Sequence, residues 1–157
     1  MKFCIKQHVF SWGDRFTIYD ENGEDRYYVQ GDIFTFGKQL HLCDLAGNEL
    51  TYIEQELFTF RPRYTINSGG ECLAEVVKEF TFFSNEFTVS GLDWTVSGDF
   101  LDHDYAIYDA SGAKICNVEK EWFTWGDTYA IEISNTVDWV MALSVVIAID
   151  AIMEPKN

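Results

Sequence analysis

The densest group of potential metal ligands in this 157-residue sequence is the segment Asp99-Phe-Leu-Asp102-His103-Asp104. Carboxylates and an imidazole placed this closely are able to hold a divalent cation such as Ca²⁺ or Mn²⁺. A calcium loop, however, spaces its acids at alternate positions and adds a turn glycine and a bidentate glutamate, and this segment lacks that pattern. The spacing therefore favours a solvated turn, with a metal site as the weaker alternative.

Asp150 is a second unusual carboxylate, because it follows a long apolar run near the end of the sequence. If that run is helical, Asp150 lies in the last turn, where the negative end of the helix dipole disfavours an ionised carboxyl. We expect it to reach solvent or to accept hydrogen bonds from strand amides at the rim of the fold. The functional alternative is a polar site in which Asp150 lines a small ligand cavity.

Catalytic motifs are not apparent. The histidines are His8, His41 and His103, and the sequence contains neither a G-x-S-x-G nucleophile motif nor a glycine-rich phosphate loop. Glu119 and Glu121 would share one face of a strand, as expected for a charged outer surface. The sequence thus predicts a protein that is not an enzyme, with no catalytic residue and no cofactor.

The charge balance limits the choice of partners. There are 11 Lys and Arg residues against 26 Asp and Glu, for a formal net charge of −15. Nucleic acids and anionic lipid surfaces are bound through clustered basic residues, so we expect no nucleic-acid partner. A protein partner of unknown identity fits this acidic exterior better.

The cysteines and the N-terminus bear on localisation. Cys4, Cys43, Cys72 and Cys116 lie far apart, and no apolar signal segment follows Met1. We therefore expect a cytoplasmic, reduced chain.

A short phrase, aromatic-[Ser/Thr]-aromatic, recurs along the chain. It stands at Phe10-Ser11-Trp12, Phe34-Thr35-Phe36, Phe58-Thr59-Phe60, Phe80-Thr81-Phe82 and Phe123-Thr124-Trp125. The intervals are 22 to 24 residues except for the last, which is nearly double and predicts a degenerate sixth copy near residues 99–108. Alternating apolar residues in and after each phrase predict two strands per unit, and hence about twelve strands.

Turn dipeptides separate many of these units, and only one segment is helical in pattern. The turns are Asn22-Gly23, Ala46-Gly47, Gly69-Gly70 and Ser111-Gly112. We expect a helix over residues 137–152, with Asn135 as its N-cap. Between Trp139 and Ile149 it is apolar on every side apart from Ser144, and so must be buried. At 11 residues this run is shorter than the roughly 20 of a membrane span, so we expect no stable insertion, with a membrane tail anchor as the alternative.

These features together predict a mainly β protein, a single domain over residues 1–157. About twelve antiparallel strands would close into a barrel whose bore is too wide for side chains alone to fill. A helix 10 to 12 Å across fits such a bore. The apolar C-terminal helix is therefore expected at the centre of the barrel.

Several ordered segments resemble a known family. They are Ile5–Gly23, Gly91–Phe100, His103–Ile107, Trp122–Ile131 and Val145–Ile152. Together they resemble the LOR family, which includes bacterial YxjI-like proteins. The resemblance implies a tubby C-terminal-like fold, a twelve-stranded barrel around a hydrophobic helix that is shared with phospholipid scramblases. Tubby domains bind phosphoinositide head groups through Lys and Arg, whereas the nearest basic segment here is only Arg61-Pro62-Arg63.

Two hypotheses on function follow. The first is a non-enzymatic interaction or signalling module whose acidic exterior meets a protein partner. The second is a phospholipid or small-ligand binding domain of the tubby or scramblase type, aided by Ca²⁺ that offsets the negative surface. A hydrolase with an unrecognised site is a weaker third hypothesis.

Overall fold

The computed structural model describes residues 1–7, 15–32, 36–80, 85–100, 102–121 and 127–153. Within these ranges the chain forms twelve strands and one helix. The strands are β1 (Lys2–Gln7), β2 (Arg15–Asp20), β3 (Asp25–Gly31), β4 (Gln39–Asp44), β5 (Glu49–Gln55), β6 (Arg63–Ser68), β7 (Glu71–Phe80), β8 (Asn85–Ser90), β9 (Trp94–Asp99), β10 (Asp104–Tyr108), β11 (Lys114–Glu121) and β12 (Asp127–Ile133). The helix is α1 (Trp139–Met153).

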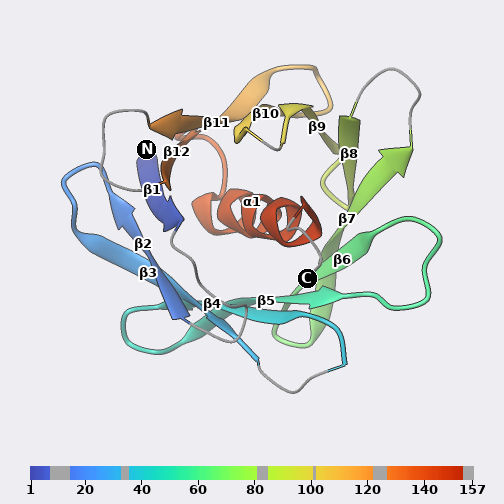
Figure 1. Cartoon of the computed structure of the whole chain (residues 1–157), viewed down its shortest axis with the longest axis horizontal. Helices are drawn as coiled ribbons and strands as arrows, with labels where there is room; N and C mark the ends of the chain where they lie inside the picture. The colour runs from blue at the N-terminus through green and yellow to red at the C-terminus, as the bar shows by residue number, and fades with distance from the viewer. Residues whose placement is uncertain (8–14, 33–35, 81–84, 101, 122–126, 154–157) are drawn as a thin grey trace.

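The strands form a closed antiparallel barrel. Each strand pairs with its neighbours in the sequence, and β1 completes the ring by pairing with β12, with Phe3 opposite Ile131. Figure 1 shows α1 in the middle of this ring. The predicted fold, a barrel of about twelve strands around a central hydrophobic C-terminal helix, is confirmed.

The core lies between α1 and the inward-facing side chains of the strands. Alternate residues such as Leu40 and Leu42 on β4 are buried against the helix, as the period of two predicts. Ser144, the polar exception in the helix, donates a hydrogen bond to the Val140 carbonyl and shares another with Thr51 of β5, at 2.7 Å each. In the ranges that the structure describes, no helix is long and apolar enough to span a membrane.

The start of α1 differs from the prediction. Asp138, not Asn135, is the N-cap: its Oδ1 accepts hydrogen bonds from the amides of Val140 at 2.9 Å and Met141 at 3.3 Å. Asn135 lies instead in the turn after β12 and accepts a hydrogen bond from the N-terminal ammonium group. Both residues are able to cap a helix, and the helix starts after Asp138 because residues 134–137 are still turning away from β12.

The aromatic phrases also lie elsewhere than predicted. We expected their alternation to form strands, but Phe58, Thr59 and Phe60 lie in the connection between β5 and β6, and Phe36 lies in the connection between β3 and β4. Phe80 is the last residue of β7. The remaining phrase residues, 10–12, 34–35, 81–82 and 123–125, lie outside the described residues. In the unit whose phrase is described throughout, β5, residues 58–60 and β6 follow one another, and the count of strands in the described residues is the one predicted.

Antiparallel pairing places alternate connections at the same end of the barrel. The predicted glycine turns join β2 to β3, β4 to β5, β6 to β7 and β10 to β11 at one end, which we call the turn end. The connections between β3 and β4, and between β5 and β6, lie at the opposite end, the phrase end. The C-terminus of α1 faces the phrase end, where Lys38 Nζ donates a hydrogen bond to the Ala151 carbonyl at 3.0 Å.

Candidate functional site

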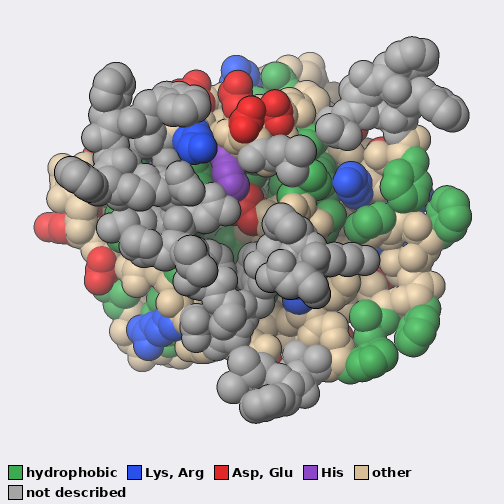
Figure 2. All heavy atoms as spheres, viewed as in Figure 1, with side chains coloured by type: hydrophobic (Ala, Val, Ile, Leu, Met, Phe, Trp, Pro, Cys, Tyr) green, Lys and Arg blue, Asp and Glu red, His purple; other side chains and the backbone are tan. Residues whose placement is uncertain are grey.

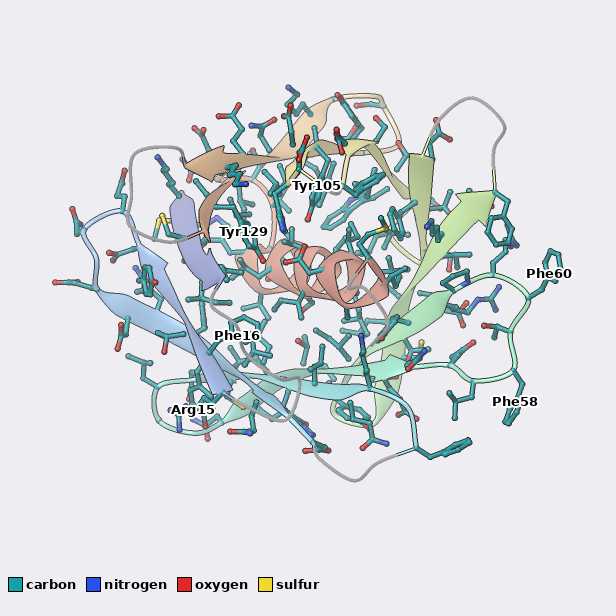
Figure 3. All side chains as sticks on the ribbon, in the orientation of Figure 1. Arg15, Phe16, Phe58, Phe60, Tyr105 and Tyr129 are labelled. Carbon is teal, nitrogen blue, oxygen red and sulfur yellow. The ribbon has the colours of Figure 1, made fainter. Side chains whose placement is uncertain are left out.

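Four phenylalanine side chains are exposed at the phrase end. The exposed fractions are 78% for Phe36, 95% for Phe58, 92% for Phe60 and 62% for Phe80. Figure 3 shows Phe58 and Phe60 pointing away from the barrel, and hydrophobic side chains gather along the same edge in Figure 2. We call these four residues the phenylalanine rim. Single exposed apolar side chains are common, but a group of large ones is a candidate interaction surface.

The rim is continuous across neighbouring connections. The rings of Phe36 and Phe58 lie 6.4 Å apart, and those of Phe60 and Phe80 lie 5.9 Å apart in an edge-to-face arrangement. Each pair joins two segments that are separate in the sequence. Because none of the four belongs to the hydrophobic core cluster or packs against it, their apolar surface contributes little to holding the barrel together.

The connection that carries Phe58 and Phe60 is internally braced. Thr59 Oγ1 donates a hydrogen bond to the Arg61 carbonyl at 2.8 Å, and the Pro62 carbonyl accepts one from the Lys78 amide of β7 at 3.0 Å. Phe58 has a φ of 61°, a left-handed conformation that costs a residue other than glycine about 1 to 2 kcal/mol. The loop therefore holds an unfavourable backbone conformation while presenting its phenylalanines to solvent, as is common at functional sites.

The two arginines beside the rim are already engaged within the chain. Arg61 pairs with Glu79 of β7. Arg63 lies 3.8 Å from Glu56 and 3.6 Å from Glu75. The basic segment singled out in the sequence is thus neutralised by its own surroundings.

A second cluster of polar groups lies inside the barrel, beside the last turns of α1. The Tyr129 hydroxyl of β12 donates a hydrogen bond to Asp150 Oδ2. The ring of His103 stacks on that of Tyr129, with centroids 4.4 Å apart and planes within 6°. Tyr105 of β10 is 3% exposed, and its hydroxyl has no hydrogen-bond partner among the described residues. Figure 3 shows both tyrosines in the barrel wall above the helix.

Burial controls the protonation of this cluster. It raises the pKa of Asp150 to about 7, although the hydrogen bond from Tyr129 acts in the opposite direction. Burial also raises the pKa values of Tyr105 and Tyr129, and the nearby charge of Asp150 raises them further. Asp150 thus lies in the last turns of α1, and its partner is the Tyr129 hydroxyl in place of the solvent or strand amides that we expected.

The predicted metal ligands do not converge. Asp99 ends β9, Asp104 begins β10, and Asp102 lies in the turn between them, where its amide donates to Asp99 Oδ1 at 3.3 Å. His103 adopts a φ of 50° and directs its ring to Tyr129. Across the described ranges, no three His, Cys, Asp or Glu side chains are arranged to hold a metal ion.

The other residues singled out in the sequence belong neither to the phenylalanine rim nor to the polar cluster around Asp150. Glu119 and Glu121 lie on β11 as predicted, and His8 lies outside the described residues. Sequence reasoning missed a bridge on the outer face of the barrel, where His41 of β4 hydrogen-bonds to Asp32 at 2.9 Å and to Glu49 of β5.

His41 also stacks on Tyr52, at 5.0 Å between ring centroids. Burial by itself lowers the pKa of His41, but the hydrogen bonds and charges of Asp32 and Glu49 raise it above the usual value. This bridge ties three neighbouring segments of the wall together.

Comparisons with known proteins agree with this architecture. The family model for LURP-one-related (LOR) proteins matches residues 1–150. The uncharacterized protein YxjI of Bacillus subtilis is 34% identical over 153 residues, which cover 98% of this chain and 94% of YxjI. An X-ray structure of a protein from Arabidopsis thaliana superposes with a TM-score of 0.73 at 18% identity, covering 98% of this chain and 91% of the other, and so shares the fold.

Proposed function

Since this chain belongs to the LURP-one-related family, we propose that it is a non-enzymatic interaction module, and that the phenylalanine rim attaches it reversibly to a lipid–water interface. The observation that carries the proposal is the exposure of four phenylalanines, at 62% to 95%, from neighbouring connections at one end of the barrel. Aromatic side chains are favoured at the level of the lipid head groups, where an apolar ring leaves water without entering a rigid pocket.

The titratable groups of the described residues support a role other than catalysis. Burial raises the pKa of the Cys116 thiol to about 12, which makes it a poor nucleophile. His41 is held between two carboxylates on the barrel wall, and Asp150 is bound by Tyr129. His41 and Asp150 therefore each have a structural partner, and the Cys116 thiol is buried in the core.

The phenylalanine rim has enough apolar surface to attach the protein reversibly to a lipid surface. Transfer of one phenylalanine side chain out of water is worth about 1.5 to 3 kcal/mol. Removing two of them should then cost about 3 kcal/mol or more, which corresponds to a loss of roughly 100-fold in affinity. Phe58 and Phe60 are the best pair to remove because they are the most exposed and do not pack on the core.

Vesicle flotation with a rim variant tests the proposal. We would compare the wild type with the double variant Phe58→Asn/Phe60→Ser on phosphatidylcholine vesicles, with and without Ca²⁺. Asparagine suits position 58 because it tolerates the left-handed backbone there. The matched control is Leu45→Ser, which removes a side chain that is 56% exposed in the turn between β4 and β5, at the opposite end of the barrel.

We expect the wild type and Leu45→Ser to float and the double variant to stay in solution, with equal melting temperatures for all three. Failure of the wild type to float under either condition would overturn the lipid proposal. A protein partner at the same rim would then be the hypothesis to test, by photo-crosslinking from position 60. Equal loss in Leu45→Ser would show that binding is not specific to the rim.

A further inference from the structure

The connection that carries Phe58 and Phe60 is free of acidic residues in a strongly acidic chain. Residues 57–62 at the rim include no Asp or Glu, whereas residues 20–25 at the turn end include four of them. The formal net charge of −15 therefore repels an anionic surface. Other parts of the phrase end add to this repulsion, since Asp99, Asp102 and Asp104 lie there.

Three of the cations near the rim already have partners within the chain, which limits their use against this repulsion. Lys38 donates to the last turn of α1, at the Ala151 carbonyl. Arg61 is paired with Glu79, and Arg63 lies between Glu56 and Glu75. Recruiting any of them to a lipid phosphate would leave a carbonyl or a carboxylate without its partner, which offsets the gain.

We propose that the rim recognises zwitterionic lipid interfaces by aromatic insertion and not anionic head groups by charge. The inference rests on the proposed function and specifies its ligand. The phenylalanines enter the head-group region while the intramolecular ion pairs stay intact, so binding needs no release of counterions from the lipid. The attachment should accordingly respond little to salt, since screening acts on interactions between charges and not on apolar burial.

Flotation on two vesicle compositions at low and high salt tests this inference. The vesicles are phosphatidylcholine alone and phosphatidylcholine mixed with phosphatidylglycerol. The proteins are the wild type, Phe60→Ser as the aromatic variant and Arg61→Gln as the charge variant; residues 60 and 61 are neighbours, so both changes are made at the same place. Thermal melting of each variant confirms that the barrel is intact.

The wild type should bind phosphatidylcholine with less than about a threefold change between the two salt concentrations. It should bind the anionic vesicles at least about threefold more weakly at low salt, with the difference closing at high salt. Phe60→Ser should lower the affinity about tenfold or more on phosphatidylcholine, and Arg61→Gln should leave it within about threefold.

The opposite pattern would overturn the inference. It would consist of preferential binding to the anionic vesicles, a steep loss at high salt and a large loss in Arg61→Gln. That result would leave the proposed function standing, because the protein would still bind a lipid surface through its rim. Absence of flotation on every vesicle would instead defeat the proposed function itself.

Discussion

Replacing Asp150 with asparagine should make the protein more stable at neutral to alkaline pH. The folded state raises the pKa of this carboxyl from the usual 3.8 to about 7 because the barrel removes it from water. The folded state then binds the proton more tightly than the unfolded state. The contribution of Asp150 to stability is most favourable below about pH 4 and falls as the pH rises to about 7, above which it stays constant.

The size of the effect on stability follows from the difference between the pKa of Asp150 in the folded protein and its usual value. A difference of about three pKa units corresponds to about 4 kcal/mol of stability lost between the two limits. Asparagine cannot ionise, and its side-chain carbonyl is still able to accept the hydrogen bond from Tyr129. The free energy of unfolding of Asp150→Asn should therefore exceed that of the wild type by up to about 4 kcal/mol near pH 8. Near pH 4 the two values should agree within about 1 kcal/mol.

Urea unfolding at these two pH values is the assay. Asp102→Asn is the matched control, since it makes the same chemical change on an exposed turn at the same end of the barrel, and it should not reproduce the pH-dependent gain. The reasoning would be refuted if Asp150→Asn lost stability near pH 8, or if its difference from the wild type were the same at both pH values. Either result would mean that the protein stabilises an ionised carboxylate at this position.

Four further outcomes are expected. Deleting residues 136–157 should abolish cooperative unfolding, followed by circular dichroism, because the bore of the barrel would lose α1. Gly98→Ala should cost more than about 2 kcal/mol in urea unfolding, since Gly98 has a φ of 141° and an added Cβ would lie 2.5 Å from a backbone oxygen of β10. Gly112→Ala, in an open turn, should cost about 1 kcal/mol. The raised pKa of His41 means that its bridge to Glu49 stabilises the fold fully below about pH 6.5 and weakens as the pH rises through the folded pKa. In urea unfolding, the free energy of unfolding of His41→Gln should change with pH by about 0.5 kcal/mol less than that of the wild type.

The sequence was sufficient to predict the barrel because one physical constraint follows from another. The repeat fixed the number of strands, and the turn dipeptides fixed their antiparallel order. The segment from Trp139 to Ile149 was too apolar to lie on a surface. The interior of a wide barrel must also be occupied by an element other than the strands. Fold class, strand number and the place of the helix all follow from these three observations.

The position of the aromatic phrases could not be predicted in the same way. Alternation of period two is shared by a strand and by a short loop, and Phe58-Thr59-Phe60 has both aromatics and a threonine, which strands favour. What distinguishes the loop is the left-handed Phe58 and the bracing of Thr59 against Arg61. The one available signal was the basic, proline-containing segment that follows the phrase, which is unusual inside a strand.

The contacts between side chains on different strands could not be predicted from the sequence either. The partner of Asp150 is Tyr129, 21 positions away on β12, and the bridge from His41 to Glu49 depends on how β4 pairs with β5. Register between strands is set by the whole pattern of burial and turns, including the irregularity between Leu42 and Cys43 in this pair. A local sequence pattern does not contain that information.

Closure of the barrel also limits the ways in which another molecule could associate with the protein. Closure pairs the backbone of every strand and leaves no sheet edge on which another molecule could add a strand. Association with a partner must then use side chains, and the phenylalanine rim is a group of large apolar ones exposed without a role in the core. Exposed aromatics carry a risk of self-association, which the net charge of −15 reduces by repulsion between copies. A surface that is costly to keep exposed, and that the fold does not need, is the basis on which we propose a contact with a lipid interface.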